Sequence, residues 1–191
     1  MTLSGSEGRD ALVMIDLQRD FFVNDELERR RDDLAERATR LASCARANDV
    51  PVVEVHTVHD PRGSTWTRSM KADEQGMALA GSPGVERLAG IVPGDVVITK
   101  TRDSAFFGTD LLAVLRRWGV DRLVLVGVST ESCIAATATE AFAHDLDVVV
   151  VSDATASVRA AWHDQALDLL ERLYRQRAVS TADVEHMWTT A

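Results

Sequence analysis

The stretch Leu123–Ala136, LVLVGVSTESCIAA, contains the pattern on which both the fold and the candidate site depend. Its first four residues form a short apolar run, which is typical of a buried strand. A polar corner follows Gly127 and leads into an alanine-rich segment that carries Cys133. The sequence therefore predicts a strand, a tight corner and a helix, with one thiol near the beginning of that helix.

The placement of Cys133 favours a reactive thiol. Unpaired backbone N–H groups and the positive end of the helix dipole stabilise negative charge at a helix N-terminus. We therefore expect the pKa of this thiol to be lowered, so that the nucleophilic thiolate forms readily. The alternative is an inert cysteine buried within the helix, and the pattern alone leaves that alternative open.

Apolar runs alternate with helix-favouring segments along the whole chain. The expected strands are Ala11–Ile15, Pro51–Thr57, Asp95–Thr99, Leu123–Val126, Asp147–Val151 and a short Ala178–Ser180. The expected helices are Leu27–Ala47, a short turn over Val85–Ala89, Asp110–Trp118, Glu131–His144, Ala160–Gln176 and Thr181–Met187. Continuous apolar strands between helices are typical of a parallel sheet covered on both faces. The sequence predicts an α/β fold with a mainly parallel sheet of five to six strands.

Length, charge and cysteine content narrow the class of protein. The 191 residues predict one domain over 1–191, with the polar residues 1–10 as a loose N-terminal tail. Lys and Arg total 21 against 30 Asp and Glu, which argues against nucleic-acid and anionic-membrane partners because both need a basic surface. No apolar run has the length of a signal-peptide core or a membrane span, and two cysteines do not make a disulfide scaffold. We expect a reduced, cytoplasmic protein.

Three chemically active side chains follow three of the expected strands. Asp16 follows the first strand, Lys100 the third, and Cys133 lies just beyond the fourth. Ligands of parallel α/β sheets bind at the carboxyl ends of the strands, so we expect these groups to converge there. A nearby ammonium lowers the pKa of a thiol, and a carboxylate can take its proton and return it to a leaving amine. Alone, Asp16 also fits a loop cap, Lys100 a solvated surface residue and Cys133 a buried helix residue, so their joint placement carries the prediction.

The irregular segment from Val58 to about Gly84 is long for a compact domain, and such segments are usually functional. Other loop residues expected at the same sheet edge are candidate substrate contacts: Phe22, Trp66, Arg102 and Phe106. The aromatic side chains either line a pocket or anchor their loops on the core. Arg102 either binds a substrate carboxylate or pairs with Asp103 or Asp20.

Four segments, in this order and spacing, resemble the isochorismatase-like cysteine hydrolases, a family that includes nicotinamidases and hydrolases of ureido and carbamoyl amides. They are ALVMIDLQRDFF with Asp16, PGDVVITKTRDSAFFGTDL with Lys100, LVLVGVSTESC with Cys133, and DVVVVSDATAS, spanning about residues 11–157. The resemblance implies a three-layer Rossmann-like fold and an Asp–Lys–Cys triad. It also implies a cis peptide bond between Val128 and Ser129, which aims the amides of Ser129 and Cys133 at an oxyanion.

The same resemblance implies a cysteine-dependent hydrolase that cleaves a C–N bond of a small amide, carbamoyl or ureido compound through a thioester. Cys133 attacks the carbonyl, the amine leaves with a proton from Asp16, and water releases the acid. Two alternatives stay open: an ether or ester hydrolase of the isochorismatase type, and a non-catalytic binding member of the fold. A homodimer or homotetramer is also implied.

Two departures from the family pattern bear on the site. Metal-binding nicotinamidases carry an Asp-Trp-His segment after the second strand, where this chain has HTVHDPRGSTW. His56, His59 and Asp60 are conceivable ligands, but their order differs and His56 falls within the expected strand, so we expect no metal and no cofactor. Many relatives carry Asn where this chain has Glu131. That carboxylate either caps the helix, which the dipole favours, or contacts the substrate and disfavours anions.

Overall fold

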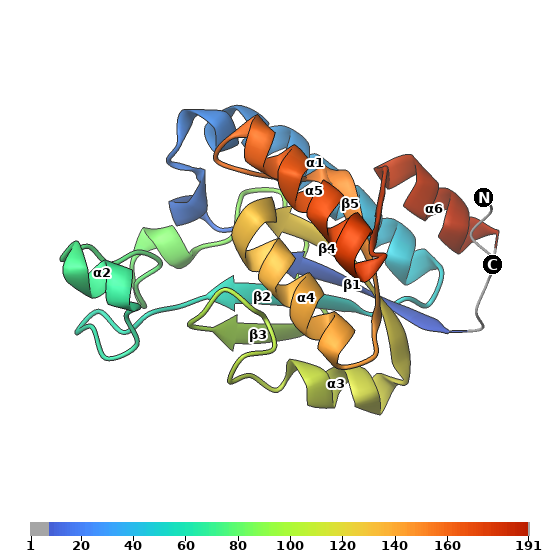
Figure 1. Cartoon of the computed structure of the whole chain (residues 1–191), viewed down its shortest axis with the longest axis horizontal. Coiled ribbons are helices and arrows are strands. Elements are labelled where there is room, and N and C mark those ends of the chain that lie inside the picture. The colour runs from blue at the N-terminus through green and yellow to red at the C-terminus, as the bar shows by residue number, and fades with distance from the viewer. Residues whose placement is uncertain (1–7, 191) are drawn as a thin grey trace.

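A six-stranded sheet in the order β3-β2-β1-β4-β5-β6 forms the centre of the molecule (Figure 1). The computed structural model describes residues 8–190 of the chain. The strands are β1 (Arg9–Ile15), β2 (Val52–Thr57), β3 (Val96–Lys100), β4 (Val120–Val128), β5 (Asp147–Ala156) and β6 (Arg177–Val179). All neighbouring strands are parallel. The predicted three-layer, Rossmann-like α/β fold is confirmed.

Helices cover both faces of this sheet. They are α1 (Asp25–Ala47), α2 (Arg68–Ala72), α3 (Leu111–Trp118), α4 (Ala135–Ala143), α5 (Ala160–Tyr174) and α6 (Thr181–Thr189). Figure 1 shows α3, α4 and α5 in front of the sheet, and α1 packs with α6 against the other face. None of the helices in residues 8–190 combines the length and the apolar composition that a membrane crossing needs.

Burial on two faces explains the continuous apolar runs. Successive side chains of a strand point to opposite faces, so one strand contributes to two cores. In β1, Leu12 and Met14 join the core beneath α1 and α6. Val13 and Ile15 join the core beneath α3, α4 and α5. Because both faces of such a strand are buried, polar and apolar residues do not alternate along it and its sequence is uniformly apolar.

The strand order reverses between β1 and β4. From β1 the chain continues to β2 and β3 on one side, whereas β4 continues to β5 and β6 on the other. Ligands of such sheets bind where the order reverses, outside the carboxyl ends of the strands. The two central strands approach closely there: Gly127 has φ 120°, and a Cβ on it would lie 1.9 Å from the carbonyl oxygen of Ile15. Only glycine fits this position.

The N-terminal boundary differs from the prediction. Residues 1–7 of the expected loose tail lie outside the described residues, but Arg9 and Asp10 belong to β1. Asp10 is buried, and its carboxylate accepts hydrogen bonds from Arg122 at 2.8 and 2.9 Å and from Nε1 of Trp188 at 2.7 Å. The prediction of a tail is therefore wrong for these two residues, because both pair with β4 and the carboxylate of Asp10 finds buried partners.

Two expected helical segments also differ. The turn expected at Val85–Ala89 is a 3-10 turn over Pro83–Val85, after which Leu88 donates its backbone N–H to the Leu17 carbonyl at 2.8 Å. The cysteine does not lie in a regular α-helix. It lies in a π-helical turn, Thr130–Ile134, that precedes α4.

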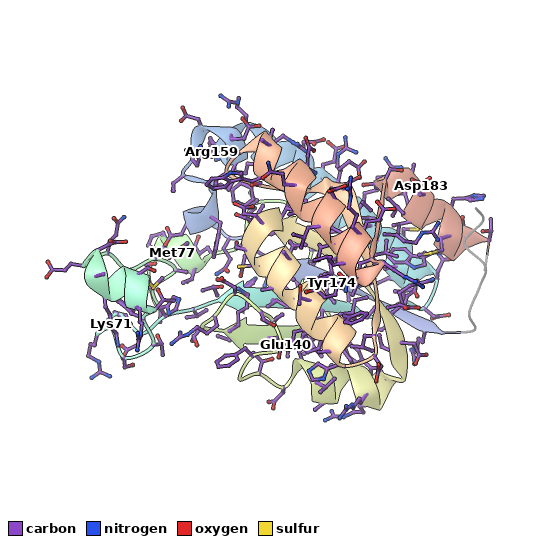
Figure 2. All side chains as sticks on the ribbon, viewed as in Figure 1. Lys71, Met77, Glu140, Arg159, Tyr174 and Asp183 are labelled. Carbon is purple, nitrogen blue, oxygen red and sulfur yellow. The ribbon has the colours of Figure 1, made fainter. Side chains whose placement is uncertain are left out.

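Residues 59–79 form a compact loop, called here the projecting loop, that carries α2 beyond the ends of β2 and β3 (Figure 1). Its neck is closed by backbone hydrogen bonds of 2.8 Å from His59 N to Ala78 O and from Ala80 N to His59 O. Figure 2 shows Lys71 and Met77 on this part of the molecule. Compact loops with closed necks are frequently functional.

Candidate active site

The carboxyl ends of three strands bring a carboxylate, an ammonium and a thiol together. Asp16 follows β1, Lys100 ends β3, and Cys133 follows β4. Nζ of Lys100 lies 2.7 Å from Oδ2 of Asp16 and 3.3 Å from Sγ of Cys133. None of the three side chains is more than 4% exposed. The lysine ammonium therefore contacts both groups that exchange a proton in a thiol–carboxylate reaction.

Thr57, which the sequence analysis did not identify, holds Asp16 in place and is itself held by Gln18. Thr57, the last residue of β2, donates both its backbone N–H and its hydroxyl to Oδ1 of Asp16, at 3.0 and 2.9 Å. Nζ of Lys100 donates to the same hydroxyl at 2.8 Å. The buried Gln18 accepts from Thr57 N at 2.9 Å and donates to Thr57 O at 3.0 Å. Thr57 therefore links the carboxylate to the ammonium.

The charges around Cys133 do not favour the thiolate that the sequence predicts. Burial raises the pKa of Cys133 above its ordinary value, the carboxylate of Asp16 raises it further, and the charge of Lys100 offsets only part of this rise. Burial lowers the pKa of Lys100, but Asp16 and Cys133 raise it more, so the pKa is raised overall and the ammonium persists. The expectation of a lowered thiol pKa is wrong. The resting site holds a thiol beside an ion pair.

The local backbone fits the side chains that it carries. Asp16 has φ 52°, in the left-handed region that Asp and Asn tolerate better than most residues. The peptide bond between Val128 and Ser129 is cis. The carbonyl of Ser129 accepts from the N–H groups of Ser132 and Ile134, both at 3.2 Å. These bonds close the turn on which the thiol sits.

A cavity of about 350 Å³ opens onto the thiol. Its wall contains Phe21, Thr57, His59, Thr67, Ser69, Met70, Asp73, Gln75, Met77, Thr101, Arg102, Asp103 and Cys133. The projecting loop supplies much of this lining. Apolar side chains stand beside a small number of polar and charged groups, as in sites that bind small organic molecules.

Of the five predicted substrate contacts, one lines this cavity and four lie elsewhere. Arg102 is in the wall, where its guanidinium donates to the backbone carbonyls of Thr65, at 2.8 Å, and Thr101. Phe22 packs in the core beneath α1 and borders a different cavity. Phe106 is buried beneath α3 and α4, with its ring 5.2 Å from that of His144. Both phenylalanines anchor their loops.

Trp66 also has a structural position rather than one in the cavity wall. Its Nε1 donates to the Asp60 carbonyl at 3.0 Å. The ring lies against Gly63 and Gly76, and a Cβ on Gly76 would lie 2.5 Å from its Cζ2. The indole therefore fills the interior of the projecting loop that lines the cavity.

Glu131 lies in the first turn of the π-helical segment and not in the lining of the cavity. Its Oε2 is buried and has no hydrogen-bond partner among residues 8–190. The neighbouring Thr130 anchors the turn on α5, with Oγ1 2.8 Å from Nδ1 of His163. The position of Glu131 fits the helix-terminus interpretation and gives no support to a substrate contact.

The conceivable metal ligands have other partners. Nε2 of His56 lies 2.7 Å from Oε1 of Glu54 within the sheet. Nδ1 of His59 lies 3.1 Å from the Thr65 carbonyl, and Asp60 accepts from Ser64 and Arg62. Across residues 8–190 the structure gathers no group of three His, Cys, Asp or Glu side chains that could hold a metal ion.

The fold and the site define a class: a three-layer α/β protein with a buried thiol, carboxylate and ammonium at the reversal of its strand order. A model of the isochorismatase domain matches residues 10–185. The chain belongs to the isochorismatase family.

Three similar proteins illustrate what this family contains. A Pseudomonas chlororaphis protein named "Probable isochorismatase" is 31% identical over 163 residues, which are 84% of this chain and 77% of the relative. A crystal structure of an isochorismatase family protein from Desulfovibrio vulgaris has a TM-score of 0.84 and 32% identity, over 95% of this chain and 99% of that one. N-carbamoylsarcosine amidase from Thermoplasma acidophilum has a TM-score of 0.77 and 27% identity, over 91% and 96% of the two chains. The family is hydrolytic and has amidases among its members.

Proposed function

We propose that this protein is a cysteine-dependent hydrolase that cleaves a C–N bond of a small amide, carbamoyl or ureido compound. One observation carries the proposal: Nζ of Lys100 contacts both Asp16 and Cys133, at 2.7 and 3.3 Å, beside a cavity of small-molecule size. A thiol provides the nucleophile, and a carboxylate beside it provides general base and general acid.

In the first half of the reaction the thiol proton moves to Asp16 as Sγ of Cys133 attacks the carbonyl carbon. A C–S bond forms and the carbonyl electron pair moves to oxygen, where the amides of Ser129 and Cys133 are proposed to bind it. The oxyanion then collapses and the C–N bond breaks. The leaving nitrogen takes the proton from Asp16, and a thioester remains.

In the second half water replaces the amine. Asp16 takes a proton from the water molecule while the oxygen of that water attacks the thioester carbonyl. The C–S bond breaks, the acid leaves, and the sulfur recovers its proton from Asp16. The net reaction consumes one water and releases one amine and one acid, with Asp16, Lys100 and Cys133 returned to their starting states.

The second candidate is an ether or ester hydrolase of the isochorismatase type. The name of the Pseudomonas chlororaphis relative, "Probable isochorismatase", favours it. The thiol in the cavity favours C–N hydrolysis instead, because a cysteine nucleophile suits acyl transfer. A non-catalytic binding protein is the third candidate, and it predicts no turnover of any compound.

The proposal includes a homodimer or homotetramer in the cytoplasm, with the small molecule as the other partner. Exposed apolar side chains on α4 and α5 support association, with Phe142 51% and Leu173 64% exposed. Two free thiols, Cys44 and Cys133, fit a reducing compartment.

A substrate screen with two matched cysteine variants tests the function. Release of ammonia or acid is measured for nicotinamide, carbamoyl amides and ureido acids, with isochorismate cleavage followed separately. We expect Cys133→Ser to lose at least about 1,000-fold of the C–N activity, whereas Cys44→Ala, which packs in α1 on the other face of the sheet, keeps it. Mass spectrometry of the quenched reaction should detect an acyl group on Cys133.

Other outcomes assign the protein differently. Cleavage of isochorismate alone supports the second candidate. An active Cys133→Ser variant contradicts nucleophilic catalysis by this thiol, and the absence of any turnover supports the binding protein.

A further inference from the structure

His59 lies in the wall of the cavity that contains Cys133, yet the proposed mechanism gives it no role. It begins the projecting loop, two residues after the end of β2, and is only 2% exposed. A buried polar ring in a cavity wall is costly unless both of its nitrogens find partners. The partners of the two nitrogens therefore decide what the ring contributes.

One ring nitrogen is committed to the protein. Nδ1 lies 3.1 Å from the carbonyl oxygen of Thr65 and 3.2 Å from the hydroxyl of the same residue. A carbonyl oxygen can only accept a hydrogen bond, so Nδ1 carries the hydrogen. This contact selects the tautomer in which Nε2 has a lone pair.

The ring is neutral at ordinary pH. Burial lowers the pKa of His59, and the positive charges of Arg102 and Lys100 lower it further. The hydrogen bond to Thr65 and the charge of Asp16 raise the pKa by less, so it lies below its usual value. Neutrality and the bond to Thr65 together make Nε2 an acceptor.

The second nitrogen has no partner within the described chain. Across residues 8–190 no donor reaches Nε2 of His59, whereas Nδ1 has two contacts. An unprotonated nitrogen in a cavity repels carboxylate oxygens and binds N–H groups. Nε2 is not one of the fully buried polar atoms without a partner in the described residues, so it is accessible from the cavity, where a ligand N–H can donate to it.

We propose that His59 determines substrate specificity by accepting a hydrogen bond from a substrate N–H at Nε2. The substrates are then compounds that keep an N–H near the reacting carbonyl: primary or secondary amides, carbamoyl compounds and ureido compounds. Esters, vinyl ethers and fully N-substituted amides lack this donor. The inference rests on the proposed C–N hydrolysis and excludes from it the amides whose nitrogen carries no hydrogen.

A pair of substrates and a pair of variants test the inference. The substrates are an amide that the screen identifies and the methyl ester of the same acyl group. In His59→Asn the shorter side chain keeps a donor for Thr65 but loses the acceptor at Nε2. In His59→Gln the longer side chain brings an amide oxygen to about the position of Nε2. Comparing one substrate with the other cancels general damage to the site.

We expect the ratio of kcat/KM for amide to that for ester to fall by about 10-fold to 100-fold in His59→Asn, and to recover in part in His59→Gln. An equal loss for both substrates in both variants overturns the inference and leaves His59 a structural role.

A second measurement needs no turnover and so separates this inference from the proposed function. Histidine ¹⁵N spectra of the wild-type protein report which ring nitrogen of each of its five histidines carries the hydrogen. The His59 resonances are assigned by their loss in His59→Asn. A neutral ring with hydrogen on Nδ1 supports the inference, and hydrogen on Nε2 overturns it. Absence of C–N hydrolysis contradicts the proposed function whichever tautomer is found.

Discussion

The hydroxyl of Thr57 fixes which oxygen of Asp16 can take the thiol proton. An ammonium has no acceptor, so Lys100 donates to the Thr57 oxygen, and the one hydroxyl hydrogen goes to Oδ1 of Asp16. Oδ1 also accepts the backbone N–H of Thr57. With Oδ1 occupied twice, Oδ2, which faces Lys100, is the oxygen left for the proton.

We therefore expect Thr57→Val, which has nearly the same shape, to lower kcat by about 10-fold to 100-fold with little change in KM, because the loss of the hydroxyl frees Asp16 to rotate. Thr57→Ser keeps the hydroxyl and should restore most of kcat. Steady-state kinetics on the amide from the screen checks both. Equal losses in the two variants would point to packing of the methyl group instead.

For single residues, the sequence predicts the groups with unusual chemistry but does not identify the residues that hold them in place. Asp16, Lys100 and Cys133 follow strands, so the rule for parallel sheets brought them to one edge. Thr57 is an ordinary residue at the end of an apolar strand, and only the register of β2 beside β3 shows that it meets Lys100. The thiol pKa was predicted with the wrong sign because the helix-dipole argument omitted burial and Asp16.

Among the elements, the projecting loop owes its shape to Trp66. The indole packs against Gly63 and Gly76 inside the loop, behind the residues that line the cavity. The sequence indicated a functional irregular segment at this place, but an aromatic residue in a loop fits a lining role and an internal anchor equally well. Phe21 and Phe22 show the same ambiguity: Phe21 lines the cavity and Phe22 enters the core.

We expect Gly76→Ala to raise KM several-fold and to lower kcat less, because the new methyl group displaces Trp66 and shifts the wall of the cavity. Overpacking of this kind costs about 1–3 kcal/mol of stability. Lys71→Ala on the exposed side of α2 is the control and should leave KM within about twofold, as expected of surface changes. Kinetics together with urea unfolding distinguishes a local shift from global damage, which would lower kcat in proportion to the unfolded fraction.

For the whole molecule, Asp10 joins three elements that are distant in sequence. Its carboxylate binds Arg122 of β4 and Trp188 of α6 from a position in β1. The overall architecture was predictable because strand and helix alternation leaves few topologies for a parallel sheet. The pairing of Asp10 with Arg122 was not predictable, because neither residue has a sequence pattern that identifies its partner.

Asp10→Ala should lower the free energy of unfolding by about 3 kcal/mol, since it leaves the Arg122 charge and the indole N–H without their acceptor. The exposed ion pair of Asp168 with Arg172 provides the control, and Asp168→Ala should cost less than about 1 kcal/mol. Urea denaturation followed by tryptophan fluorescence measures both. Similar losses of unfolding free energy in the two variants would show that burial of the Asp10 contacts adds nothing to their contribution to stability.

The contacts of Lys100 also bear on how the proposed reaction responds to salt. Moving a proton from Cys133 to Asp16 transfers a negative charge between two atoms that both touch the same ammonium, at 3.3 and 2.7 Å. The number of buried charges is the same before and after, and counterions in solution screen charges at such depth very little. The chemical step is therefore independent of ionic strength. Any dependence of the rate on salt then belongs to the capture of the substrate at the outer wall, where Arg102 and Asp103 meet the solvent.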